Sequence, residues 1–235
     1  MSSIILTPAT MARFLFMEQL KWTMWFLSFM FVIYIVVVSF ASGPHSSFID
    51  LVNFSNGSSS IYMLVLGILT TSSFFYYYML QGVTRKSFFL GTMVSSVLLA
   101  VAITIILIVS AFLLQFISGW AGWNIHAQEL DYTSSFSAFI YIFVSLVILH
   151  LIYFLIGWMI GLTFYRSGWR YGLLSIACSI LVIAIAGALI EATHFSFFTN
   201  ITTVPTFIAM PLSIVLIVLL LGFNYRLIKD ITIKI

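Results

Sequence analysis

Long apolar runs separated by short polar segments dominate the chain. A helix needs about 20 consecutive, mostly apolar residues to cross the hydrocarbon core of a bilayer. Six stretches predict such helices: 22–42, 61–80, 89–117, 137–164, 172–190 and 207–225. The third and fourth are longer than one crossing requires, so we expect them to tilt or to extend beyond the lipid. The predicted fold is an all-α membrane protein with six transmembrane helices.

Charged residues are rare and lie between the apolar runs. They make up 6% of the 235 residues, against 63% hydrophobic residues, whereas about a quarter of a soluble domain is charged. With six crossings, all nine Lys and Arg residues fall on one side, and Asp50, Glu129, Asp131 and Glu191 fall on the other. Because cytoplasmic loops carry the excess of Lys and Arg, we expect both termini in the cytoplasm, with the helices in the plasma membrane.

The segments on the acidic side differ from one another. Residues 42–60, SGPHSSFIDLVNFSNGSSS, are rich in Ser, Gly and Asn, which is typical of an exposed loop. Asn53, Asn56 and Asn200 each begin an Asn-X-Ser/Thr sequon, which has no meaning in a bacterial protein. Residues 191–205, EATHFSFFTNITTVP, are aromatic and β-branched, and we expect them to re-enter the membrane as short interfacial helices.

The residues before the first span have their own pattern. Thr7 and Pro8 suit the N-cap and the first position of a helix. Apolar residues then recur at helical spacing, while Arg13, Glu18 and Lys21 supply charge elsewhere. The pattern predicts an amphipathic helix along the cytoplasmic interface, which either anchors the chain or contacts a partner. The predicted domains are this helix (1–21), the six-helix transmembrane domain (22–226) and a cytoplasmic tail (227–235).

The sequence contains no motif for nucleotide or metal chemistry. Neither the phosphate-binding loop GXXXXGK[ST] nor HExxH occurs, and there is no Cys/His cluster. The single cysteine, Cys178, lies in an apolar run and is expected to be a small buried residue. Ser145 and His150 point in different directions on one predicted helix, which disfavours a membrane protease. We predict no catalytic residue, no metal site and no nucleic-acid partner.

Polar and small residues inside the predicted spans have two interpretations each. His150 is either hydrogen-bonded to a neighbouring helix, which we favour, or a ligand or proton relay. The predicted spans carry no charge near their middle, which argues against an ion-coupled transporter. The small-residue pairs Gly157/Gly161 and Ser175/Ser179 allow close helix packing, either within the chain or across a dimer.

The loop between the second and third spans has more detail than orientation requires. Gly82 can end one helix and Thr84 can begin the next. Arg85 and Lys86 follow, and then Phe88. We predict a rigid knob with a basic face and an aromatic tip that docks into a groove of a soluble partner. The simpler interpretation is that the two cations only orient the chain.

The stretch QGVTRKSFFLGTMV (81–94) resembles the Gly-hydrophobe-Ser/Thr-Arg-Lys/Arg-x-Phe segment between the second and third spans of type-2 (type V) ABC exporter permeases. The likeness extends to the N-terminal interfacial helix, the six spans and the aromatic segment before the sixth. It implies that this loop is a short coupling helix that docks into an ATPase through Gly82, Val83, Thr84, Arg85, Lys86 and Phe88. It also implies that Arg13, Glu18 and Lys21 lie against the same ATPase, with the second cytoplasmic loop, YRSGWRYG, as a lesser contact.

The resemblance implies partners as well. Two separate ATPase chains would bind ATP and Mg²⁺ and would pair with two permeases, identical or different. This chain would then be a transport subunit without a cofactor and without enzymatic activity of its own. Its small size is similar to that of bacterial permeases that export peptides, including bacteriocin self-protection systems and exporters of phenol-soluble modulins.

The aromatic residues of the second span are candidates for the transport pathway. By family analogy the first, second and fifth spans line it, which points to Tyr62, Phe74, Phe75, Tyr76 and Tyr77. The same residues equally suit an aromatic belt at the membrane interface. An uncharged pathway favours a hydrophobic or amphipathic peptide as cargo. The alternative function is a non-transporting membrane immunity or scaffold protein, which needs no ATPase.

Overall fold

The computed structural model describes residues 7–41, 51–121, 136–190, 206–229 and 231. These residues are helical apart from short turns, and no strand occurs among them. The elements in chain order are α1 (Pro8–Ala41), α2 (Leu51–Leu69), the π-helix η1 (Thr70–Phe75), α3 (Tyr76–Leu80), α4 (Arg85–Ala121), α5 (Phe136–Ser167), α6 (Trp169–Leu189) and α7 (Thr206–Lys229).

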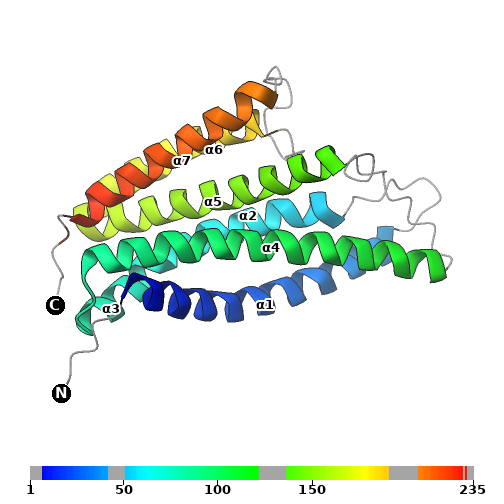
Figure 1. Cartoon of the computed structure of the whole chain (residues 1–235), viewed down its shortest axis with the longest axis horizontal. Helices are drawn as coiled ribbons and strands as arrows, with labels where there is room; N and C mark the ends of the chain where they lie inside the picture. The colour runs from blue at the N-terminus through cyan, green and yellow to red at the C-terminus, as the bar shows by residue number, and fades with distance from the viewer. Residues whose placement is uncertain (1–6, 42–50, 122–135, 191–205, 230, 232–235) are drawn as a thin grey trace.

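Among the described residues, six segments are long and apolar enough to cross a membrane, which agrees with the predicted number of candidate spans. Five are the single helices α1, α4, α5, α6 and α7, and the sixth is the continuous column α2–η1–α3. Successive columns run in opposite directions, so the start of α1 and the end of α7 lie at the same end of the bundle (Figure 1). We call this the basic end, because its described residues include Arg13, Lys86, Arg166, Arg170 and Lys229; the opposite end is the far end.

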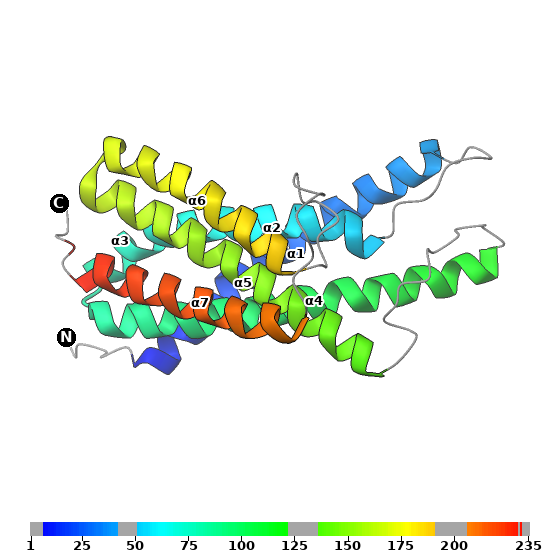
Figure 2. The ribbon, with the colours of Figure 1, turned by 90° about the horizontal axis from the view of Figure 1, so that it is seen from above.

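Helix α5 occupies the middle of the bundle (Figure 2). It packs against α2, α4, α6 and α7, while α1 packs mainly against α4. The deepest side chains include Phe154 and Trp158 of α5, both fully buried. The outer faces carry large exposed apolar side chains such as Trp25, Leu181 and Leu219. An exposed apolar surface of this extent is expected for a multi-pass membrane protein, because lipid and not water covers it.

The contact between α2 and α5 depends on glycines. A Cβ atom at Gly67 would overlap the carbonyl oxygen of Phe154, and one at Gly157 would overlap that of Leu64. A Cβ atom at Gly161 would lie 2.9 Å from another backbone oxygen of α2. The small-residue pair of α5 therefore packs within the chain, as one of its two interpretations predicted. Ser175 and Ser179 of α6 are also buried within the chain.

The prediction of an exposed loop over 42–60 is wrong in its second half, because α2 begins at Leu51. Ser55, Ser59 and Ser60 are buried, and Asn56 is only 3% exposed, so its sequon lies inside the bundle. Ser- and Asn-rich segments are typical of loops in water, but among membrane helices these side chains can face other helices. Composition alone does not separate the two cases.

Two predicted boundaries do not coincide with the ends of helices. Helix α1 runs without interruption through residues 21 and 22, from Pro8 to Ala41. Its start is as predicted, because Thr7 Oγ1 accepts a 3.4 Å hydrogen bond from the N–H of Thr10. The expected short coupling helix is also not separate, since Arg85 already belongs to the long helix α4. Whether residues 1–21 lie along the membrane surface stays a prediction.

Cys178 is exposed on α6 and not buried as predicted. The buried Ser175 and Ser179 occupy the face of α6 that meets the bundle, so Cys178 points elsewhere. Several other predictions lie outside the described residues: the re-entrant segment 191–205, the Asn200 sequon and the acidic residues Asp50, Glu129, Asp131 and Glu191.

Candidate functional site

The turn between α3 and α4 begins with a glycine C-cap, as predicted. Gly82 has φ 80°, in the left-handed region that favours glycine. Its N–H donates to the carbonyl of Met79 at 3.1 Å, and the N–H of Val83 donates to that of Tyr78 at 3.2 Å. This is the Schellman pattern, which satisfies the last carbonyls of a helix and reverses the chain.

The next helix begins at once, with Thr84 as its N-cap. The Thr84 side-chain oxygen accepts a 3.2 Å hydrogen bond from the N–H of Ser87. The Thr84 carbonyl accepts a 2.9 Å bond from the N–H of Phe88. Only Val83 separates the two caps, and its side chain is buried. Two adjacent caps leave the turn few free backbone groups and therefore make it rigid.

The structure divides the six predicted docking residues into two groups. Gly82, Thr84, Arg85 and Lys86 are exposed, whereas Val83 and Phe88 are buried. Phe88 is fully buried, with its ring 5.2 Å from that of Phe75 in an edge-to-face contact. The expected aromatic tip therefore points into the bundle, because the inward face of the first turn of α4 belongs to the core. Phe88 holds the turn in place from inside and does not present an aromatic surface.

Two arginines bind the C-terminal end of α7. Arg85 Nη1 donates to the carbonyl of Lys229 at 2.8 Å. Arg166 Nη1 donates to the carbonyls of Arg226 and Leu227 at 3.1 and 3.4 Å. The last carbonyls of a helix lack intrahelical donors and carry partial negative charge, so guanidinium groups stabilise them. We call this arrangement the α7 clamp; it joins the turn before α4 and the end of α5 to one helix end.

The start of α1 lies beside the start of α4. A Cβ atom at Gly91 would come within 2.7 Å of Met11 Cγ and 3.2 Å of the Ala12 nitrogen. This close approach places the two segments that were predicted to contact a partner next to each other. The structure thus combines them into one surface at the basic end.

The three charged residues predicted on the N-terminal helix are accessible. Lys21 Nζ lies 2.8 Å from Glu18 Oε1, with side chains 64% and 45% exposed. An exposed pair of this kind contributes less than about 1 kcal/mol to stability. Arg13 is also exposed. These charges are therefore available to a partner and do little for the fold.

A buried polar cluster, not anticipated from the sequence, lies at the start of η1. Gln19 Nε2 donates to Thr70 Oγ1 at 3.3 Å, and Ser95 Oγ donates to Gln19 Oε1 at 2.8 Å. All three side chains are fully buried. One amide thereby connects α1, η1 and α4. The signal for it was the helical spacing of Leu15, Gln19 and Thr23, which places a glutamine on the buried face of α1.

The five predicted pathway residues do not form one surface. They point in different directions around the α2–η1–α3 column. Phe75 is fully buried. Tyr62 is half-buried, with its hydroxyl 3.1 Å from Thr23 Oγ1. Phe74 is also half-buried and its ring lies 5.6 Å from that of Trp22. These three side chains pack inside the chain or against α1.

The other two pathway candidates point outward. Tyr76 and Tyr77 are 39% and 57% exposed. Ser72 and Ser73, one turn earlier, are exposed as well. We call these four residues the η1–α3 face. Its hydroxyl groups distinguish it from the outer surface around Leu181 of α6 and Leu219 of α7, where large exposed side chains are apolar.

His150 is the only histidine among the residues that the structure describes, and it is fully buried in the bundle. Ser59 Oγ lies 2.8 Å from Nε2, and Thr104 Oγ1 lies 3.3 Å from Nδ1. Neighbouring helices therefore satisfy both nitrogens, in agreement with the favoured interpretation. Within the described ranges, no group of three or more His, Cys, Asp or Glu is placed to hold a metal ion.

No protein-family model, no curated protein and no solved structure matches the chain. The likeness to ABC exporter permeases rests on the residues of the turn and on the order of the helices. The proposed function therefore rests on the geometry of the basic end.

Proposed function

We propose that the chain is the transmembrane permease subunit of an ATP-driven exporter of the type-2 ABC class. The basic end would face the bacterial cytoplasm and bind a separate ATPase subunit, within a complex of two permeases and two ATPases that hold ATP and Mg²⁺. The observation that carries the proposal is the doubly capped turn, which presents Arg85 and Lys86 at the end of the bundle while Phe88 anchors it. Orientation in the membrane needs the charges but not this rigidity.

The contacts around the turn suggest how motion of an ATPase would reach the membrane. Arg85 connects the turn to the end of α7. On the other side, α3 and η1 lead to Gln19 and so to α1. Packed helices transmit displacement because their contacts are not continuously deformable. A push on the turn would therefore move both the α2–η1–α3 column and α7.

The cargo pathway would lie between this chain and a second permease, either a second copy or a related chain. The η1–α3 face supports this part of the proposal, because it exposes two serines and two tyrosines on one short stretch of the column. A surface of aromatic rings and hydroxyl groups suits a hydrophobic or amphipathic peptide. Export of such a peptide is the function that these features support best.

Charge reversal at Lys86 tests the ATPase contact. We expect Lys86→Glu to weaken co-purification with the proposed partner ATPase, by about tenfold in affinity. Lys86→Arg keeps the charge and should retain binding. Lys86 is preferable to Arg85 for this test because Arg85 also belongs to the α7 clamp. Undiminished binding by both Lys86→Glu and the double variant Arg85→Glu/Lys86→Glu would show that the turn only orients the chain.

Transport itself separates an exporter from a scaffold or immunity protein. Vesicles that contain both subunits should take up labelled amphipathic peptides only when ATP is supplied on the side of the ATPase. A scaffold would bind its target without nucleotide. Peptide movement at full rate in vesicles that lack the ATPase would contradict the proposal.

A further inference from the structure

Helices α1 and α4 separate toward the far end of the bundle (Figure 2). Near the basic end they are in close contact at Gly91, where a Cβ atom would come within 3.2 Å of the backbone of α1. Farther along, the side chains of Phe31 and Tyr34 stand between the two helices. Small residues draw helices together and aromatic residues hold them apart, so the pair forms a wedge.

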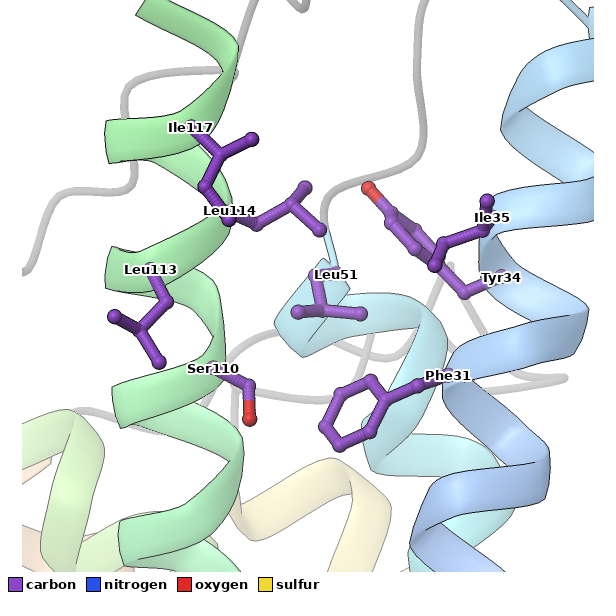
Figure 3. Close-up of a pocket in the computed structure, with 8 residues that line it drawn as sticks. All are labelled: Phe31, Tyr34, Ile35, Leu51, Ser110, Leu113, Leu114 and Ile117. Atoms are coloured by element: carbon purple, nitrogen blue, oxygen red, sulfur yellow. The ribbon is translucent and has the colours of Figure 1, made fainter. Parts of the chain in front are cut away.

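A groove of about 180 Å³ occupies the open part of this wedge (Figure 3). Phe31, Tyr34 and Ile35 of α1 line one wall, and Leu51 at the start of α2 lies between the helices. Leu51 and Tyr34 are 2% and 3% exposed. They belong to a small hydrophobic cluster separate from the main core, and they close the inner end of the groove.

The opposite wall belongs to α4 and is equally apolar. Leu113, Leu114 and Ile117 line it, together with Ser110. The Ser110 hydroxyl donates to the carbonyl of Ile106 at 2.7 Å, so its proton is not available to a ligand. None of the eight described residues that line the groove is charged. An apolar cavity of about 150 Å³ excludes water and binds a hydrocarbon such as benzene, so the groove favours a hydrocarbon occupant.

The groove opens sideways onto the lipid-facing surface. Its rim residues Ile35, Leu113 and Ile117 are 52%, 56% and 54% exposed. All three lie within the candidate membrane spans Pro8–Val37 and Arg85–Ile117, which are long and apolar enough to cross a bilayer. The groove is therefore continuous with the surface that lipid covers, and the nearest hydrocarbon is the acyl chain of a lipid in the leaflet opposite the basic end.

We propose that this groove binds one acyl chain of a membrane lipid. A lipid on a flat helix face touches protein on one side, whereas a chain in the groove touches both walls and Leu51. Each additional contact adds dispersion energy, and an empty groove would forfeit it. The bound chain exchanges more slowly than the surrounding lipid. It fills the space between α1 and α4.

The experiment uses the full chain in liposomes that contain a phospholipid with a diazirine in its acyl chain. After irradiation, mass spectrometry measures labelling of the peptides that carry the groove, relative to the exposed face of α7 around Leu219. We expect about tenfold more labelling in the groove, the excess that corresponds to about 1.4 kcal/mol of preferential binding. Equal labelling of the two surfaces would overturn the proposal.

Two variants test whether the groove itself is responsible. Ser110→Phe should fill it and reduce labelling to the α7 level. Ser28→Phe is the matched control, because Ser28 is exposed on α1 and its hydroxyl bonds in the same way, to the carbonyl of Met24 at 2.8 Å; it should leave labelling unchanged. If Ser110→Phe does not elute as a monodisperse helical protein, Ile117→Trp narrows the exposed rim instead. Labelling that persists in a folded, filled variant would overturn the proposal.

Other occupants give distinct results. A photoactivatable amphipathic peptide that labels the groove while the lipid does not would assign it to cargo and overturn the lipid assignment. Protein–protein crosslinks at Ile117 with no lipid labelling would assign the groove to another segment or to a second copy, with the same consequence.

Discussion

At the level of single residues, the buried side chain of Gln19 links three elements through hydrogen bonds. Its amide bonds to Thr70 and Ser95, which lie on two other elements. Both partners are fully buried. In a membrane bundle such hydrogen bonds contribute about 0.6 kcal/mol each, with a maximum of about 1.7. The cluster therefore has a modest stabilising effect but strongly restricts how α1, η1 and α4 can sit.

Replacing this amide gives a prediction at the same scale. Gln19→Leu keeps the size of the side chain but removes both hydrogen bonds, so we expect the free energy of unfolding to fall by about 1 kcal/mol. Thermal unfolding in detergent measures the change. Ser28→Ala removes an exposed hydroxyl and serves as the control, with an expected change within about 0.5 kcal/mol. Equal stability of Gln19→Leu and the native chain would show that the cluster is energetically neutral.

At the level of elements, the contact between α2 and α5 depends on backbone atoms and not on large side chains. Gly67 and Gly157 each lie against a carbonyl of the opposite helix, so neither position has room for a Cβ atom. Such proximity gives two long helices dense packing, which is the main attraction between helices in lipid. The π-helix η1 follows directly after this contact. A segment of π-helix often marks a functional site, and here it separates the tightly packed half of the column from the basic turn.

Two glycine substitutions compare a crowded site with an open one. Gly157→Ala inserts a methyl group where it overlaps Leu64, and we expect a loss of about 1 to 3 kcal/mol in stability. Gly222→Ala on α7 meets nothing within 4 Å, so it should be neutral or stabilising by up to about 1 kcal/mol. Melting temperatures in detergent give the comparison. A similar effect at both positions would contradict the close α2–α5 contact.

At the level of the whole molecule, the basic end is bound together by the α7 clamp. Arg85 begins α4 and Arg166 lies in the last turn of α5, yet both donate to the last turn of α7. Because these bonds are exposed, their energies are small. Their importance is that they join elements: the Arg85–Lys229 hydrogen bond connects the proposed ATPase contact to the end of α7.

Hydrogen exchange tests the clamp. Arg166→Ala should speed amide exchange in the last turn of α7 about threefold, which corresponds to about 0.6 kcal/mol. Arg85→Ala should have a similar effect at Lys229. Arg170→Ala, in the first turn of α6, is the control. The Arg170 guanidinium lies over the ring of Trp169, 5.7 Å from its centroid, so its removal should leave exchange in α7 unchanged. Exchange rates that do not respond to either clamp variant would show that α7 ends independently of the turns.

The number and order of the candidate spans, the gathering of Lys and Arg at one end, and the two caps around Gly82 and Thr84 were all predictable from the amino-acid pattern. These follow from local properties, namely the length of apolar runs, the spacing of charges and the preferences of single residues for helix ends. The same local information also predicted that His150 would be bound by neighbouring helices, although not by which residues.

The face with which each helix meets its neighbours could not be predicted and follows from the packing of the folded bundle. This packing turns Phe88 inward, exposes Cys178, buries the serines of α2 and brings Arg85 to a carbonyl far along the chain. It also divides the aromatic residues of the second crossing between the core and the outer surface. Nearly every position in these helices is apolar, so hydrophobic periodicity carries little information about direction. The packing of helices against each other supplies what the pattern lacks, because glycine contacts and buried polar groups allow few arrangements.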